Sequence, residues 1–189
     1  MKRKLILSIA VVLSAIGFSS CEKGDGFDEY GFAYIYMPQA TVNGGLNNNY
    51  YVPSGEGEYT YNFKIEGNQL KILLGVLRSG DLPNKGFSVD VVARRDTTQQ
   101  IITNNLVDNG VVFPQELYSL PEKVIVPDNK NSESFYMTVP VDALKNDAYT
   151  GKRLVLTVAI ANPTQFELSE VNTNTVVILD VNAIRTHIQ

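Results

Sequence analysis

The 189-residue chain carries 16 basic and 20 acidic residues, a net charge of −4 at neutral pH, and holds one cysteine and no tryptophan. An acidic chain without a lysine or arginine cluster lacks the electrostatic footprint of a nucleic-acid-binding protein. A single cysteine cannot form a disulfide within the chain, so the fold must depend on packing, which a domain of this length can supply.

The N-terminal segment predicts a secretory signal peptide over residues 1–20. Three basic residues at 2–4 precede an apolar run from Leu5 to Phe18, and small residues follow it. A helix that crosses the hydrocarbon layer needs about 20 apolar residues, so this run is too short for a retained membrane anchor. Removal of the leader leaves 13 basic and 20 acidic residues, a net charge of −7.

The only cysteine, Cys21, stands directly after the small residues of the leader. This arrangement resembles the lipobox of bacterial lipoproteins, although Phe18 occupies the position where the common pattern has leucine. The resemblance implies that Cys21 is the lipidated residue and that a membrane is a partner through the lipid anchor. Each buried CH₂ of an acyl chain contributes about 0.8 kcal/mol, so several chains would hold the protein firmly. The alternative is a free thiol in a secreted protein.

Residues 21–30 are rich in glycine and acidic side chains and show no apolar periodicity, which predicts a flexible acidic tether. Acidic residues directly behind a lipobox cysteine also resemble the surface-export signal of Bacteroidetes lipoproteins. That resemblance implies a lipid-anchored outer-membrane protein exposed at the cell surface, with the periplasmic face as the alternative. A plain solvated spacer is the other interpretation of the tether.

From residue 31 onward the sequence predicts one domain built of β-strands. Apolar and polar residues alternate at 59–65 and 86–94, which is typical of strands with one buried face. More uniformly apolar runs at 70–77, 154–161 and 175–181 predict central strands, and the runs at 123–126 and 134–141 predict two further strands. Many strands with turn residues between them favour an all-β sandwich over residues 31–189.

One stretch departs from the strand pattern and predicts a short helix near residues 97–107. Asp96 could cap it, with Gln99 at the third helical position, and Gly110 could end the region. The run from Asp96 to Thr98 also resembles the acceptor motif for O-glycosylation in Bacteroidetes, which makes Thr97 a candidate for modification. A three-residue pattern of this kind also arises by chance.

Two groups of aromatic residues are candidates for ligand binding. Tyr50 and Tyr51 lie in a segment rich in asparagine and glycine that predicts a loop, and rings beside amides suit a glycan-binding site. The alternative is that this pair folds back onto the sandwich. The aromatic residues that alternate from Tyr30 to Tyr36 could also stack on sugars, but burial of both faces of that strand is the plainer interpretation.

The sequence contains no recognisable catalytic or metal-binding constellation. His187, the only histidine, lies near the C-terminus, where a buried carboxylate can hardly hold it as a Ser-His-Asp triad requires. Zinc needs more Cys and His ligands than the chain has. Lys130 occupies a ligand position of the calcium-loop-like run 128–133, so we expect a polar hairpin turn there.

We therefore expect no cofactor and no enzyme activity. Residues 151–153 and 55–60 match phosphate-binding loops only in part, so we regard both as chance matches. A pair of carboxylates at the spacing of a glycosidase cannot be seen in a sequence and stays the open alternative.

Three stretches together resemble domain-of-unknown-function family 1735, the N-terminal module of many Bacteroidetes surface lipoproteins. They are AYIYMPQA at 33–40, a Tyr-containing segment with a strand pair at 113–144, and two strands around an Asn-rich crossing at 152–181. The resemblance implies an immunoglobulin-like antiparallel β-sandwich displayed at the cell surface. It supplies no catalytic residues, although relatives often carry a following glycosidase-like or lectin-like domain.

These observations predict a lipid-anchored, non-enzymatic surface protein that acts in adhesion or as an accessory glycan-binding module. Its expected partners are a membrane and a glycan or a host or matrix protein. The alternative is a structural subunit, fimbrial or scaffolding, that assembles through sheet edges.

Mass spectrometry of the membrane-bound protein is expected to find acylated Cys21 as the N-terminal residue, because the lipobox pattern places cleavage directly before it. A different N-terminus would contradict the lipobox assignment.

Overall fold

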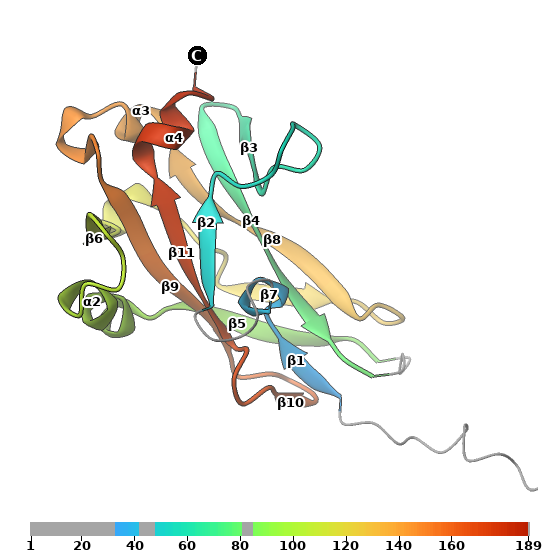
Figure 1. The fold of residues 1–189 in the computed structure, drawn as a ribbon. Coiled ribbons are helices and arrows are strands. Elements are labelled where there is room, and N and C mark those ends of the chain that lie inside the picture. The colour runs from blue at the N-terminus through green and yellow to red at the C-terminus, as the bar shows by residue number, and fades with distance from the viewer. Residues whose placement is uncertain (1–32, 42–47, 81–84, 189) are drawn as a thin grey trace, which may run out of the picture. The chain divides into compact units, whose positions relative to one another are not determined.

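The predicted strands form two sheets, A and B, in the computed structural model, which describes residues 33–41, 48–80 and 85–188 (Figure 1). The expected all-β sandwich is thereby confirmed. The predicted leader and tether, with Cys21, lie outside the described residues, as do Tyr30 and Phe32. None of the described helices is long and apolar enough to cross a membrane.

Sheet A contains β1 (Tyr34–Tyr36), β3 (Phe63–Glu66), β4 (Gln69–Arg78), β8 (Ser132–Pro140) and β10 (Glu167–Leu168). Strand β4 organises the sheet, because β8 pairs along one side of it while β3 and β1 pair with the two ends of its other side. Strand β10 adds to the free side of β1. Buried and more exposed residues alternate from Ser134 to Pro140 in β8, whereas β4 is buried without a break from Leu74 to Val76. The outer face of sheet A is therefore mixed: it carries Lys71, Tyr136 and Thr138, but also Leu73 and Leu77.

Sheet B contains β2 (Asn49–Val52), β5 (Phe87–Ala93), β6 (Gly110–Val112), β7 (Lys123–Val126), β9 (Arg153–Ala161) and β11 (Asn174–Asp180). The strand order is β2-β11-β9-β5-β7, and β6 pairs with β9 beside β5. The interior of β9 and of β11 is buried without interruption, which confirms that both are central strands.

The pairing departs from the antiparallel expectation in three places. β1 with β10, β2 with β11, and β6 with β9 are parallel pairs, so both sheets are mixed. In each pair one member is a short strand, and the two members lie far apart in the sequence. Parallel strands need a long crossover connection, which strand patterns along a chain do not reveal.

One large core fills the space between the sheets. Its members include Ile35 of β1, Met37 directly after that strand, Leu154 and Leu156 of β9, and Phe113. Two short helices close one end, α3 (Val141–Leu144) and α4 (Val181–Arg185), and each buries two apolar residues. The described residues also form three single-turn 3₁₀ helices: Pro38–Ala40, Gln115–Leu117 and Asp147–Tyr149.

A second, smaller core lies on the outer face of sheet B. Helix α2 (Arg95–Thr103) and the loop after it lie against β9 and β6. The cluster contains Val107, Val155, Val176 and Ile178, with Ile101 and Ile102 packed against it. The Thr98 hydroxyl is fully buried, accepts a hydrogen bond from the Thr157 amide at 2.8 Å and donates one to the Arg94 carbonyl. This side chain therefore joins the helix to the central strand β9.

The helix differs in detail from its prediction. It starts before residue 97 and ends at Thr103, and Gly110 begins β6 instead of ending the helical region. Arg94 is the N-cap residue, and its side chain makes no capping hydrogen bond. Asp96 lies inside the first turn, where a carboxylate favours the helix through its dipole without capping it.

Two sequence predictions of local structure were wrong. In the run predicted as a strand at 59–65, only residues from Phe63 onward are in β3; Tyr59 is fully exposed and Ile65 is 39% exposed. β3 is an edge strand with few neighbours, so the apolar residues of its period-two pattern do not all become buried on one face. The turn at 128–133 is not a hairpin, because it connects β7 in sheet B with β8 in sheet A.

The change Thr98→Val is expected to lower the free energy of unfolding by about 1 to 3 kcal/mol, because it keeps the shape but leaves the buried Thr157 amide without an acceptor. Thr97→Val, on the exposed neighbour, is the matched control and should stay within about 0.5 kcal/mol of the wild type. Equal midpoints for the two variants in urea denaturation would refute the anchoring role of Thr98.

Candidate functional site

The two candidate tyrosines lie on a strand, so the prediction that they belong to a loop was wrong. Tyr50 and Tyr51 are central in β2, where they pair with Val177 and Ile178 of β11. Consecutive residues of a strand face opposite sides of the sheet. Tyr50 and Tyr51 therefore cannot form one platform for a ligand.

Tyr50 faces the inner core, as the folding-back alternative proposed. Its ring packs against the core, and burial raises the pKa of its hydroxyl from 10.0 to about 12, against the opposing effect of a hydrogen bond with Asn62. The Asn62 amide also donates to the Tyr51 carbonyl at 2.7 Å and accepts from the Ser54 amide. Asn62 thus fixes the C-terminal end of β2, next to both tyrosines.

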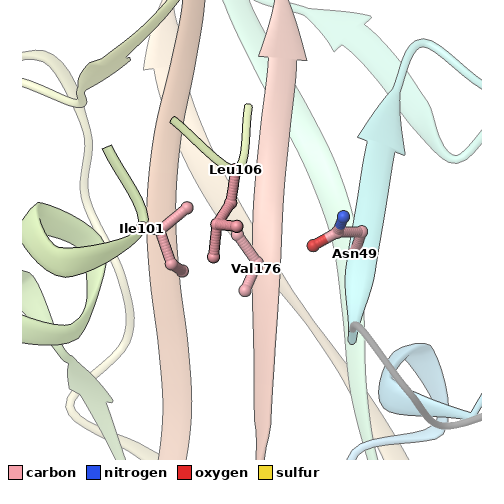
Figure 2. Close-up of a pocket in the computed structure, with 4 residues that line it drawn as sticks. All are labelled: Asn49, Ile101, Leu106 and Val176. Carbon is pink, nitrogen blue, oxygen red and sulfur yellow. The ribbon is translucent and has the colours of Figure 1, made fainter. Parts of the chain in front are cut away.

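Tyr51 faces outward and is 46% exposed. Asn49 precedes it by two residues and lies on the same face, next to a pocket of about 130 Å³ lined by Asn49, Ile101, Leu106 and Val176 (Figure 2). Leu106 is 66% exposed although its neighbours Ile101 and Val176 belong to the outer core. We call Asn49, Tyr51, Ile101, Leu106 and Val176 the Tyr51 surface.

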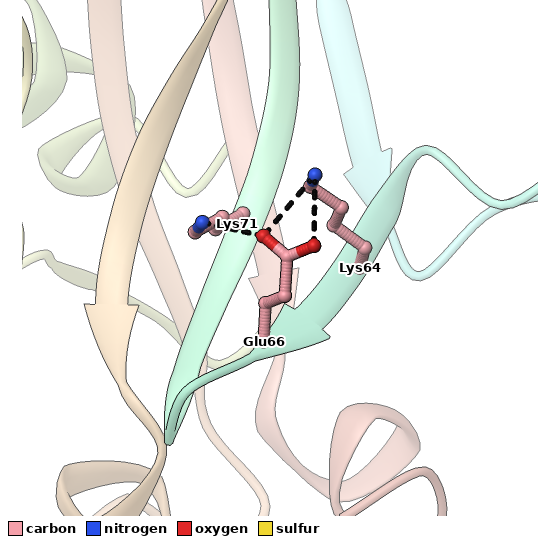
Figure 3. Close-up of polar contacts among 3 residues, drawn as sticks. All are labelled: Lys64, Glu66 and Lys71. Atoms are coloured by element: carbon pink, nitrogen blue, oxygen red, sulfur yellow. Dashed lines mark hydrogen bonds and ion pairs between the residues drawn. The ribbon is translucent and has the colours of Figure 1, made fainter.

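A second arrangement of functional groups lies on the outer face of sheet A. The Glu66 carboxylate lies between two lysines, with Lys71 Nζ at 2.6 Å and Lys64 Nζ at 3.2 Å from Oε2 (Figure 3). Hydrogen bonds from Lys71 and Lys64 hold the pKa of Glu66 below its ordinary value. Lys64 Nζ also lies 4.9 Å from the centre of the Tyr136 ring, a cation–π distance.

Beside these charges runs a groove along the free side of β8, of about 470 Å³. It is lined by seven residues, which we call the β8 groove: Lys71, Ser119, Leu120, Pro121, Phe135, Tyr136 and Thr138. Ser119 and Thr138 close one end of it, because their backbones exchange hydrogen bonds of 2.9 and 3.0 Å and their hydroxyls are also hydrogen-bonded.

The sequence did not identify Lys64, Lys71 or Tyr136 as a group. Each occupies an outward position of its own strand, and the register brings Lys64 opposite Lys71 and Thr138 opposite Lys71. The only available signal was a polar residue at alternate positions of three separate strands. Register and strand order cannot be read from such a signal, so the group appears only in the folded chain.

The remaining sequence candidates are dispersed. Thr97 is exposed in the first turn of α2 and not in a loop, and its modification stays a prediction. His187 does not extend freely from the domain, since its ring packs edge-on against Tyr61 and Phe63 at 5.1 and 5.2 Å. The described residues contain no group of three or more His, Cys, Asp or Glu side chains that could hold a metal ion.

The partial match to a dinucleotide fingerprint at 55–60 forms a self-contained turn. The Thr60 hydroxyl accepts hydrogen bonds from the amides of Glu56 and Gly57 and donates to the Gly57 carbonyl. These amides are therefore already satisfied within the turn, which agrees with a chance match.

No protein-family model matches the sequence, and no curated protein matches it. Solved structures match the fold with TM-scores of about one half. A multidomain protein of Bacteroides ovatus including DUF1735 has a TM-score of 0.50 and 13% identity over 79% of this chain and 45% of its own. A protein of Bacteroides ovatus ATCC 8483 for which carbohydrate binding is proposed has a TM-score of 0.51 and 9% identity over 77% and 36%.

EndoBT-3987 of Bacteroides thetaiotamicron, an endoglycosidase solved with a Man5GlcNAc product, has a TM-score of 0.50 and 13% identity over 77% of this chain and 30% of its own. The chain thus spans between 30% and 45% of the length of these three structures. At such identities the likeness concerns the fold. It confirms the fold that the resemblance to family 1735 implied.

Raising the pH from 10 to 12 is expected to lower the free energy of unfolding by about 2 kcal/mol through Tyr50, since its pKa is about 12 when folded and 10.0 when unfolded. The folded chain keeps the Tyr50 proton to higher pH than the unfolded chain. The stability that this proton contributes is therefore fully present below pH 10 and is lost as the pH rises to 12. Tyr50→Phe keeps the ring and removes the hydroxyl, so its urea-denaturation midpoint should fall less over this range. Identical pH profiles for both proteins would contradict the assignment.

Proposed function

We propose that this chain is a lipid-anchored, non-enzymatic domain of the bacterial cell surface that binds carbohydrate through the Tyr51 surface. The observation that carries the proposal is the exposed Tyr51 ring on the same face of β2 as Asn49, which lines a small pocket together with Ile101, Leu106 and Val176. The fold, shared with a protein for which carbohydrate binding is proposed, supports the same class of ligand.

The chemistry of the Tyr51 surface suits a sugar. A pyranose has one face of C–H groups that stacks on an aromatic ring, and Tyr51 offers such a ring at the surface. The amide of Asn49 supplies polar atoms at the pocket on the same face of β2, where hydroxyl groups of a stacked sugar would lie. The pocket is too small for a whole sugar ring, so it would take a small apolar substituent, such as the methyl of an acetamido group.

The proposed location rests on Cys21 and the tether behind it. Acylation of Cys21 would attach the chain to the outer membrane, and residues 22–30 would separate the domain from the lipid surface. A domain tethered in this way can retain glycans near the cell, or attach the cell to a glycan-coated surface, without catalysing a reaction. Either face of the outer membrane is compatible with the anchor, and the cell surface is the one we propose.

Tyr51→Ala is expected to weaken binding of a sugar bearing an acetamido or deoxy group by about tenfold, because the stacking contact is lost. Tyr59→Ala is the matched control, since Tyr59 is fully exposed and does not line the pocket, and it should leave the affinity unchanged. Glycan-array screening of the purified chain selects the sugar, and calorimetry then measures its affinity for each variant.

Two results would refute the proposal. Binding of no sugar on the array would exclude a carbohydrate function for the domain. Equal losses of affinity in the Tyr51 and Tyr59 variants would place the sugar elsewhere.

A further inference from the structure

We infer that the β8 groove binds an extended acidic peptide of a partner protein, which adds to the open side of β8 as a further strand. This surface lies on sheet A, whereas the proposed carbohydrate site lies on sheet B, and the two are independent. The argument has three parts: the free backbone groups of β8, the side chains around them, and their charge.

The backbone of β8 offers unpaired groups at Tyr136. Thr138 exchanges both of its backbone hydrogen bonds with Ser119, on the side away from β4. Alternate residues of a strand direct these groups to the same side, so Tyr136 and Ser134 also point away from β4. The amide of Ser134 donates to the carboxylate of Glu133 at 3.3 Å. Within the described residues no hydrogen bond on this side reaches the backbone of Tyr136.

The open part of this edge is short and bounded at both ends. Ser119 occupies the position beside Thr138, and beyond Thr138 the strand ends at Pro140, which has no amide hydrogen. At the other end the strand begins at Ser132, directly after a turn in which the Lys130 amide donates to the Pro127 carbonyl. Sheet edges of this kind are normally protected against uncontrolled pairing. The window from Ser132 to Tyr136 fits a segment of about five residues at the spacing of a β-strand.

The side chains of the groove favour an alternating peptide. Phe135 points into the core from β8, and Leu120 packs against the same core, so the inner side of the groove is apolar at these residues. Glu133, at the next inner position, is paired with Lys130 at 3.7 Å. Lys71 and Tyr136 lie on the outer face of the sheet. A strand added beside β8 places successive side chains on these two sides, so apolar residues would face Leu120 and the residues between them would face Lys71.

The charge on the outer side selects an acidic partner. Two lysines share one carboxylate at Glu66, so the trio of Lys64, Glu66 and Lys71 has a net positive charge. A carboxylate on the added strand near Lys71 would balance that charge, whereas a cation there would be repelled. The partner is therefore an extended segment that alternates apolar and acidic residues.

The test uses the full chain and an acetylated, amidated six-residue peptide that alternates valine and glutamate; the reference peptide alternates valine and lysine. Amide hydrogen exchange followed by NMR should show slower exchange at Tyr136 with the acidic peptide, and the reference peptide should bind about tenfold more weakly. Lys71→Glu should reverse this preference, which also shows that the variant is folded. Glu66→Gln should strengthen binding of the acidic peptide about threefold, because it removes the competing carboxylate.

Lys152→Glu is the matched control, since it makes the same charge change at an exposed lysine beside sheet B and should leave the peptide preference unchanged. Unaltered exchange at Tyr136 in the presence of millimolar peptide would overturn the proposal. Equal binding of the two peptides would overturn the acidic partner. Protection of Tyr136 in the absence of peptide, together with a dimer in solution, would show that a second copy of the chain occupies the edge instead.

Discussion

The two central strands of sheet B have no polar face, and the rest of the structure depends on this constraint. β9 is buried from Leu154 to Ile160 and β11 from Thr175 to Leu179. Apolar side chains therefore project from both faces of the sheet, and each face must be covered to keep these side chains from water. Sheet A covers the inner face, and α2 with the loop after it covers the outer face. The hydrogen bond between Thr98 and Thr157 fixes the helix in that position while it satisfies a buried amide.

The candidate carbohydrate surface lies where this cover ends. Helix α2 and its loop reach β9, β6 and Val176, but β2 at the edge of the sheet presents Tyr51 to solvent. Leu106 belongs to the same margin, with one side toward the outer core and the other exposed. A partly covered apolar face beside an amide offers both kinds of contact that a sugar needs. The position of the proposed site thus follows from how far the covering layer extends.

The outer face of sheet A differs from that of sheet B in how it is covered. The central strand β4 of sheet A is only partly covered on the outer face, by Pro38 and Gln39 at Gly75, and the same face holds the partly exposed Lys71 and its partners. β8 lies at the edge of this sheet and pairs only with β4, so apart from the bridge between Thr138 and Ser119 its other side is free for backbone pairing. The two sheets therefore offer surfaces of different chemistry, one apolar and aromatic and the other charged with an open edge.

Periodicity and composition alone determined the all-β class, the central position of β9 and β11, and the presence of a helix near residue 97. They succeeded because a buried strand requires apolar side chains wherever it lies, so its signal is local. Only the tertiary structure decided the parallel pairs, the placement of Tyr50 and Tyr51 on opposite faces of β2, and the meeting of Lys64, Lys71 and Tyr136. These features depend on register and on contacts between residues far apart in the sequence, and a strand pattern contains the period of a strand but neither its partner nor its neighbours.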